Sequence, residues 1–118
     1  RDRSVSRGLG DVYKRQPLMY SLIVSLRAKE RITQVSDYIL GKWGTKANVN
    51  FLNELERCMR IIEQNPLAFR LNLELTEVHE CVVTSHNILY YTIIDEKTVL
   101  ILSLEDTRMA TTDIHIFL

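Results

Sequence analysis

The feature that most constrains the fold of this chain is a change in the spacing of its apolar residues near residue 77. Before that point, over two long segments, apolar residues recur every three or four positions, which is the period of one face of a helix. From there on, three runs rich in Val, Ile, Tyr and Thr follow one another, separated by short polar turns. A chain of this kind must bury helical faces against a sheet.

Two amphipathic helices are predicted, near residues 28–42 and 46–64. The apolar stripe of the first is Ala28, Ile32, Val35 and Ile39, and the row of the second is Ala47, Phe51, Leu55, Cys58 and Ile62. Pro66 disfavours helical geometry at the residue before it, so the second helix is expected to stop at Asn65. The short connection through residues 43–46 predicts an antiparallel helical hairpin.

Four strands are expected, at residues 20–25, 78–84, 87–94 and 98–104. The last two runs carry apolar residues on both faces, which is typical of central strands with a helical layer on one face and a partial cover on the other. The predicted order is β-α-α-β-β-β, an α+β fold class. The tail, residues 109–118, is interpreted as a short helix or a frayed extension with an apolar end.

The first sixteen residues differ in charge from the rest of the chain. They carry five cations and two anions, whereas residues 17–118 carry 10 cations and 13 anions. The body is therefore mildly acidic, which disfavours broad affinity for nucleic acid. The prefix lacks the features of a targeting peptide and resembles translated adapter sequence. We interpret residues 1–18 as a non-native or disordered prefix, with Met19 as the expected start and residues 19–118 as one domain. A basic arm that binds phosphate is the alternative.

No cofactor, metal or membrane segment is expected. Gly41 and Gly44 mark the end of a helix and form no nucleotide-binding loop, and no His or Cys pair has zinc-ligand spacing. Cys58 and Cys81 lie 23 residues apart in apolar contexts. We expect buried, reduced thiols in a cytoplasmic protein, with a disulfide left open. Apolar runs such as residues 99–102 are far shorter than the ~20 residues that span a bilayer.

Short motifs spread over residues 20–113 carry a family resemblance. They are Asp37-Tyr38-Ile39, Lys42-Trp43-Gly44, Asn65-Pro66, Cys81-Val82-Val83-Thr84, His86-Asn87, Leu89-Tyr90-Tyr91 and Asp106-Thr107-Arg108. In this order the chain resembles the RelE/ParE superfamily of toxins from bacterial type II toxin–antitoxin modules, and most of all its ParE-like, plasmid-stabilisation branch. The resemblance implies a helical hairpin packed on a curved, mainly antiparallel four-stranded sheet. It also implies a cognate antitoxin whose C-terminal segment wraps the toxin.

The resemblance implies two modes of growth inhibition. Some members of the superfamily poison DNA gyrase without being enzymes, and others cleave mRNA in the ribosomal A site. We take DNA gyrase as the first hypothesis, because an acidic body has few cations to neutralise RNA phosphates. The alternative is a ribosome-dependent mRNA endonuclease. A third hypothesis, a decayed toxin that retains only antitoxin binding, comes from two departures: His79-Glu80 stands where relatives carry a basic pair, and residues 109–112 replace the usual Asn-Pro or Asp-Pro.

RNA cleavage without a metal needs a general base, a general acid and cations around the phosphate. The residues of the strand region that supply such groups are His79, His86, Tyr90, Tyr91, Lys97 and Arg108. Of these, Arg108, Tyr91 and His86 are our catalytic candidates if the chain is a nuclease. Neighbours in a strand point to opposite faces, and we assign Tyr91 to the binding surface and Tyr90 to the core. For His86, the alternative is a turn residue bonded to backbone.

Three residues are candidates for binding a partner. Arg108 has a guanidinium that suits a phosphate or a partner's carboxylate, and a salt bridge with Asp106 or Glu105 is its alternative role. Trp43 ends the first predicted helix, where it either packs the corner of the hairpin or anchors a partner. Arg70, after Pro66, either lies near the sheet surface or is a solvated loop charge.

Overall fold

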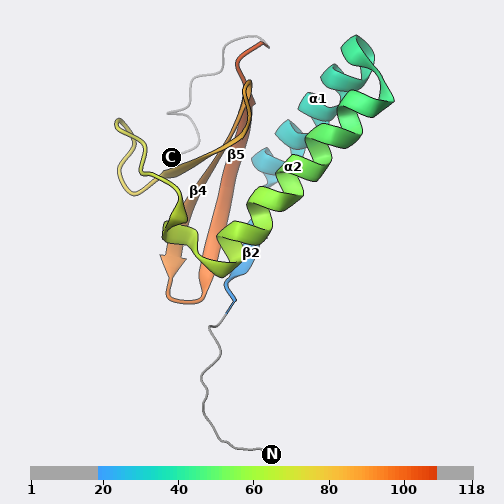
Figure 1. Ribbon diagram of the computed structural model, residues 1–118. Coiled ribbons are helices and arrows are strands. Elements are labelled where there is room, and N and C mark those ends of the chain that lie inside the picture. The colour runs from blue at the N-terminus through green and yellow to red at the C-terminus, as the bar shows by residue number, and fades with distance from the viewer. Residues whose placement is uncertain (1–18, 109–118) are drawn as a thin grey trace, which may run out of the picture.

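The computed structural model describes residues 19–108. In order along the chain, the elements are β2 (Ser21–Val24), α1 (Leu26–Trp43), α2 (Thr45–Gln64), the short 3-10 helix η1 (Pro66–Ala68), β3 (His79–Thr84), β4 (Asn87–Asp95) and β5 (Thr98–Asp106). The predicted α+β order of one strand, two helices and three strands is confirmed (Figure 1). The interpretations of residues 1–18 and of the tail 109–118 fall outside the described residues.

The strands form one open, mixed sheet in the order β2-β5-β4-β3. Antiparallel hairpins join β3 to β4 and β4 to β5, whereas β2 lies parallel to β5, with Ser21 opposite Thr98 and Val24 opposite Ile101. A parallel pair needs a long crossover connection, and here the two helices and the later hairpin provide it. β5 is consequently a central strand.

Ser25 lies between β2 and α1 and is the N-cap of the helix. Its hydroxyl accepts a hydrogen bond from the Ala28 backbone N–H at 3.0 Å, which caps the helix, and donates one to the Leu102 carbonyl at 3.0 Å. One side chain therefore begins α1 and ties it to β5. The predicted stripe faces the core, because Ala28, Val35 and Ile39 are buried and Ile32 packs against them.

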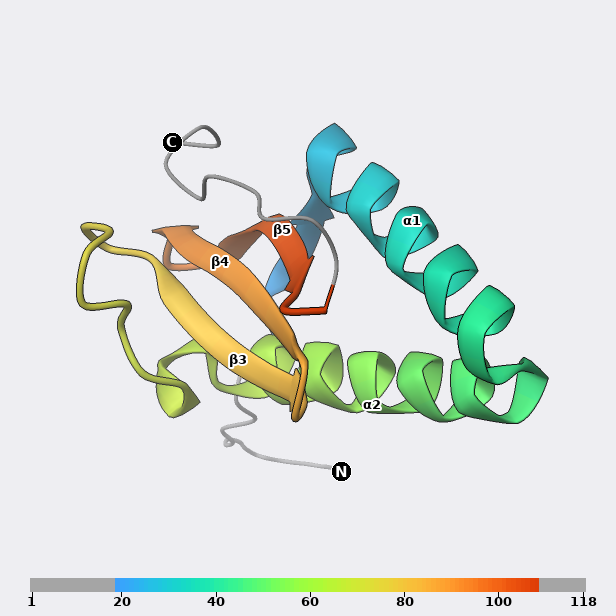
Figure 2. The same cartoon turned by 90° about the horizontal axis from the view of Figure 1, so that it is seen from above.

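A single residue, Gly44, connects the helices. The connection is therefore shorter than the predicted one, residues 43–46. Its φ of 91° and ψ of −177° lie in a region open almost only to glycine. Its N–H donates to the Leu40 carbonyl at 3.0 Å and closes α1. Seen from above, α1 and α2 diverge from this corner, and the strands lie between their other ends (Figure 2).

The main core lies between the helical hairpin and one face of the sheet. Its buried members from α2 and the strands are Phe51, Leu55, Cys58, Ile62, Cys81, Val83, Leu89, Tyr91, Val99, Ile101 and Leu104. A smaller cluster, Leu75, Val78, Tyr90 and Leu102, covers part of the other face with the segment that leads into β3. The expected apolar character of both sheet faces is therefore confirmed. None of the described helices is long and apolar enough to cross a membrane.

Candidate functional site

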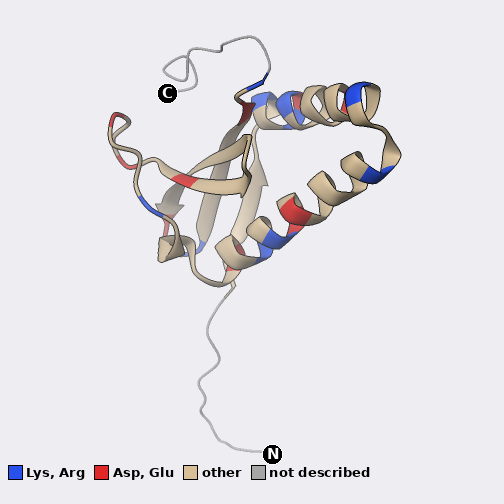
Figure 3. Ribbon diagram, turned by 45° about the horizontal axis from the view of Figure 1, so that its top comes forward, with Lys and Arg blue, Asp and Glu red and all other residues tan. Residues whose placement is uncertain are grey.

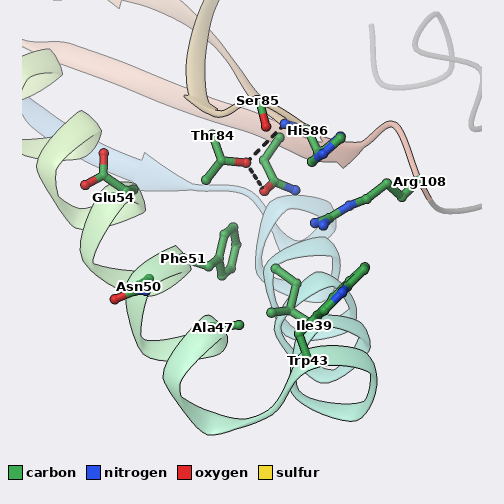
Figure 4. A pocket seen from close by; sticks show the side chains of 11 residues that line it. Ile39, Trp43, Ala47, Asn50, Phe51, Glu54, Thr84, Ser85, His86 and Arg108 are labelled. Carbon is green, nitrogen blue, oxygen red and sulfur yellow. Dashed lines mark hydrogen bonds between the residues drawn. The ribbon is translucent and has the colours of Figure 1, made fainter.

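A pocket of about 310 Å³ opens where the helical hairpin meets the β3–β4 turn (Figure 4). We call it the hairpin pocket. Its lining residues are Ile39, Trp43, Ala47, Asn50, Phe51, Glu54, Thr84, Ser85, His86, Asn87 and Arg108. Apolar side chains from the two helices form one wall, and His86 and Arg108 stand across from them (Figure 4). An apolar concave surface with a polar and cationic rim is a candidate binding site.

Arg108 is held in place at the end of β5 by Asp106. Nε of Arg108 donates to Oδ1 of Asp106 at 3.1 Å, and Nη2 donates to Oδ2 at 2.8 Å, which is a bidentate pair. The backbone N–H of Arg108 also donates to Oδ1, at 2.8 Å. The expected salt bridge with Asp106 is therefore present. Glu105 instead pairs with Arg27 and Arg31 of α1, at 3.5 and 3.1 Å.

Asp106 belongs to a buried polar network behind the pocket. Nδ2 of Asn87 donates to its Oδ2 at 2.6 Å, and Oγ1 of Thr84 donates to Oδ1 of Asn87 at 2.5 Å. Burial opposes ionisation of Asp106, but the hydrogen bonds from Arg108 and Asn87 outweigh it and lower the pKa of this carboxyl. The carboxylate therefore stays charged and keeps the Arg108 guanidinium at the pocket rim.

Trp43 lies next to Arg108 at the same rim (Figure 4). Its side chain is 50% exposed, and the Arg108 guanidinium carbon lies 4.4 Å from the centre of its ring. Tyr38 meets the Trp43 ring edge to face at 5.8 Å, and its hydroxyl donates to the Arg108 carbonyl at 3.3 Å. Trp43 thus packs the hairpin corner, as one of the two predicted roles requires, and stays half exposed at the pocket.

His86 lies in the β3–β4 turn and is exposed, as expected. Its backbone N–H donates to Oγ1 of Thr84 at 3.2 Å, and its carbonyl accepts from the Thr107 N–H at 2.9 Å. Nδ1 of His86 lies 3.5 Å from Oγ1 of Thr107. The turn is therefore fixed by its backbone, and the imidazole stands at the rim of the hairpin pocket near Arg108 (Figure 4).

The assignment of Tyr91 to a binding surface is wrong. Tyr91 is 0% exposed, its ring stacks on His79 at 5.1 Å, and its hydroxyl donates to the Pro66 carbonyl at 2.5 Å. Burial raises its pKa. The physical reason is that Tyr91 faces the helices, whereas Tyr90 points to the other sheet face and is covered there by Leu75 and Val78.

Arg70 lies away from the hairpin pocket. It is exposed, and its guanidinium contacts Glu80 at 2.7 Å at the edge of β3. Two further candidates also lie away from the pocket. His79 is buried with Nδ1 at 2.8 Å from the Phe69 carbonyl oxygen, and Lys97 lies in the β4–β5 turn, at the opposite end of β4 from His86. Of the named candidates, the structure brings together Trp43, His86 and Arg108.

The sequence indicated Asp106 as an ion-pair partner of Arg108, but it did not indicate Asn87 or Tyr38 as supports of the site. Asp106 had a local signal, because an acid two residues before an arginine can fold back onto it. Asn87 and Tyr38 had none, since their contacts depend on strand register and on helix placement. Within residues 19–108, no three His, Cys, Asp or Glu residues gather closely enough to hold a metal ion.

The fold is that of a small α+β domain in which a helical hairpin packs on an open, mixed four-stranded sheet. A model of the family described as ParE toxin of type II toxin-antitoxin system, parDE, matches residues 22–111, and the chain belongs to this family. The predicted membership of the RelE/ParE superfamily is confirmed. A comparison of the sequence with curated proteins gave no match.

Two solved structures show the same fold at low sequence identity. The chromosomal ParDE TA system from P. aeruginosa contains a chain with a TM-score of 0.64 and 13% identity, over 75% of this chain and 96% of that one. The RelBE2 toxin–antitoxin complex from Mycobacterium tuberculosis contains one with a TM-score of 0.54 and 21% identity, over 75% of this chain and 99% of that one.

Proposed function

We propose that this ParE-family chain inhibits growth by binding DNA gyrase, that the hairpin pocket contacts gyrase, and that a cognate antitoxin neutralises it. Membership of the ParE toxin family supports the place in a toxin–antitoxin module. The two similar structures, whose titles name toxin–antitoxin systems, support a protein antitoxin as partner. The choice of a protein target depends on how the candidate residues are distributed.

The dispersal of the catalytic candidates carries the proposal. An acid, a base and a phosphate-binding cation must lie within hydrogen-bond reach of one scissile bond. Here Tyr91 is inside the core, His79 is buried beside it, and Lys97 lies at the far end of β4 from His86. Tyr90 is covered on the other sheet face. Of these candidates, only His86 and Arg108 line the hairpin pocket, and Glu54, a carboxylate that also lines it, is paired with Arg57 at 2.9 Å.

Charge supports the same choice. Residues 19–108 carry 10 Lys and Arg against 12 Asp and Glu. Figure 3 shows the two signs interspersed along α2, where Arg57 pairs with Glu54 and Arg60 pairs with Glu56. A surface that holds RNA gains affinity mainly by neutralising phosphates with clustered cations. An interspersed, mildly acidic surface favours a protein target instead.

The hairpin pocket has the composition of a protein-binding hot spot. Trp and Arg are enriched at such positions, and here they stack on each other beside an apolar wall. Asp106 engages Nε and Nη2 of Arg108, and among the described residues Nη1 of Arg108 contacts no carboxylate. The site therefore fits a gyrase segment with an apolar side chain and a carboxylate next to it.

Inducible expression in a bacterial host tests the proposal. We expect growth arrest with a DNA-damage response and intact transcripts, and the purified chain should inhibit gyrase supercoiling. Arrest with cleaved transcripts would support the nuclease, and absence of arrest by a folded chain would support a decayed toxin. Trp43→Ala should weaken gyrase inhibition, whereas the matched control Arg60→Ala, on the outer face of α2, should not. A Trp43→Ala chain that still arrests growth but escapes the antitoxin would assign the pocket to the antitoxin.

A further inference from the structure

Two cysteines from different elements meet in the main core. Cys58 of α2 and Cys81 of β3 are each 0% exposed and have free thiols. Sγ of Cys58 lies 3.8 Å from the Val82 carbonyl oxygen, and Sγ of Cys81 lies 3.9 Å from the same oxygen. Both sulfurs therefore share one neighbouring atom, although 22 residues of chain separate the two cysteines.

The surroundings make the two thiols unequal. Nη2 of Arg57 lies 4.0 Å from Sγ of Cys58. A hydrogen bond from the Cys81 thiol and the Arg57 charge lower the pKa of Cys58, against burial and the nearby Glu54 carboxylate. The same hydrogen bond, with burial, raises the pKa of Cys81. The Arg57 cation beside Cys58 therefore favours the thiolate at Cys58 over Cys81, and Cys81 lies where it can react with Cys58 afterwards.

We propose that Cys58 and Cys81 form a dithiol site that a peroxide oxidises to an intramolecular disulfide between α2 and β3. The Cys58 thiolate attacks one peroxide oxygen, the O–O bond breaks, and the leaving hydroxide takes a proton to give water. Cys58 is then a sulfenic acid. The Cys81 sulfur attacks the Cys58 sulfur, the S–O bond breaks, and the hydroxide leaves as a second water with the Cys81 proton. Two thiols are oxidised and one hydrogen peroxide is reduced.

The disulfide would join two walls of the hairpin pocket. Glu54 lies one turn before Cys58 on α2, and Thr84 lies at the end of the strand that carries Cys81; both line the pocket. Oxidation would fix the distance between these walls and oppose the separation of α2 from the sheet. The oxidation of these two thiols does not depend on the identity of the toxin's target.

The test treats the full, reduced chain with hydrogen peroxide under native conditions. We expect the intact mass to fall by two hydrogen atoms, with no dimer on a non-reducing gel. After unfolding, neither thiol should react with an alkylating agent. Trypsin cleavage should then give the peptide of residues 58–60 joined to the peptide of residues 71–97, and a reductant should separate them.

Two variants keep the test specific. In Cys81→Ser, Cys58 should stop as a sulfenic acid that a cyclic 1,3-dione traps, and in Cys58→Ser no trapped product should form. Chains that keep both thiols after peroxide, that form only intermolecular disulfides, or that carry Cys58 as a sulfinic acid without a disulfide would overturn the proposal. The same holds if the disulfide forms only in denaturant, because proximity in the folded state would then play no part.

Discussion

The guanidinium of Arg108 lies 4.4 Å from the centre of the Trp43 ring, so the end of β5 stacks on the end of α1. Such a contact contributes about 0.5–1 kcal/mol when it is partly exposed. Asp106 fixes the guanidinium from behind through two hydrogen bonds. The rim of the hairpin pocket is therefore ordered before any partner binds, which lowers the entropic cost of binding.

Arg108→Lys should weaken growth arrest while the chain remains folded. Lysine keeps the charge beside Asp106 but loses the planar fork and the stacking on Trp43. We expect a loss of stability of about 1 kcal/mol and a clear rise in the concentration needed to inhibit gyrase. Urea unfolding and a supercoiling assay measure the two effects. Arg108→Ala is less informative, because it leaves the buried Asp106 charge unpaired. If the Arg108→Lys chain inhibits gyrase as well as the parent does, the guanidinium has no role in binding gyrase.

Trp43→Ala should reduce binding far more than stability. The side chain is half exposed, so its removal should cost no more than about 1–2 kcal/mol of folding free energy. A hot-spot Trp contributes about 2 kcal/mol or more to binding, which is at least tenfold in Kd. Leu73→Ala is the matched control, since Leu73 is fully exposed on the segment before β3. Equal effects of the two substitutions on gyrase binding would contradict the assignment.

Substitution of alanine for Gly44 and for Gly41 should change the free energy of unfolding in opposite directions. Gly44 has a φ of 91°, a conformation that L-residues rarely adopt, so Gly44→Ala should destabilise the chain by about 1–3 kcal/mol. At Gly41, inside α1, an added Cβ meets nothing within 4 Å, and Gly41→Ala should stabilise by about 0.5–1 kcal/mol. Chemical denaturation of both variants checks this. If both substitutions changed the free energy of unfolding in the same direction, the positive φ of Gly44 would not be what requires glycine there.

Asp106 should make the chain less stable in acid. Because its pKa is lowered on folding, its stabilising contribution is present above the unfolded value near 4 and is lost as the pH falls through the lower folded value. Asp106→Asn keeps a hydrogen-bonding oxygen toward Asn87 but cannot ionise. Its stability should therefore fall less steeply than that of the parent between about pH 5 and pH 2. Parallel profiles of unfolding free energy against pH would contradict the expected role.

Tyr91→Phe should affect stability and not toxicity. It leaves the buried Pro66 carbonyl without its donor, at a cost of about 1–3 kcal/mol. Burial raises the pKa of Tyr91, so its contribution is present below about pH 10 and is lost above it, as the unfolded chain ionises. The variant should lose that part of the alkaline instability. If the Tyr91→Phe chain is folded but no longer arrests growth, the prediction is wrong and Tyr91 takes part in toxicity.

The helices could be predicted from the sequence because their signals are local. Ile39 of α1 and Phe51 of α2 each belong to an apolar row at helical spacing, and Pro66 limits how far α2 extends. Tyr91 could not be placed, because alternation along β4 gives two faces without saying which one the helices cover. The link between Asn87 and Asp106 depends on the β4–β5 register, which shifts between Tyr90 and Tyr91. Contacts between distant segments, such as Trp43 with Arg108, leave no mark in either segment alone.

The central place of β5 has a consequence for synthesis on the ribosome. β2 is made early, yet its hydrogen-bonding partner Thr98–Ile101 emerges only after both helices and two further strands. A nascent chain that stops before Thr98 lacks the neighbour of both β2 and β4, so the sheet cannot assemble stepwise from its N-terminal end. Toxin activity should therefore arise only once translation has passed β5, and prematurely terminated products should be targets for proteolysis rather than partial toxins.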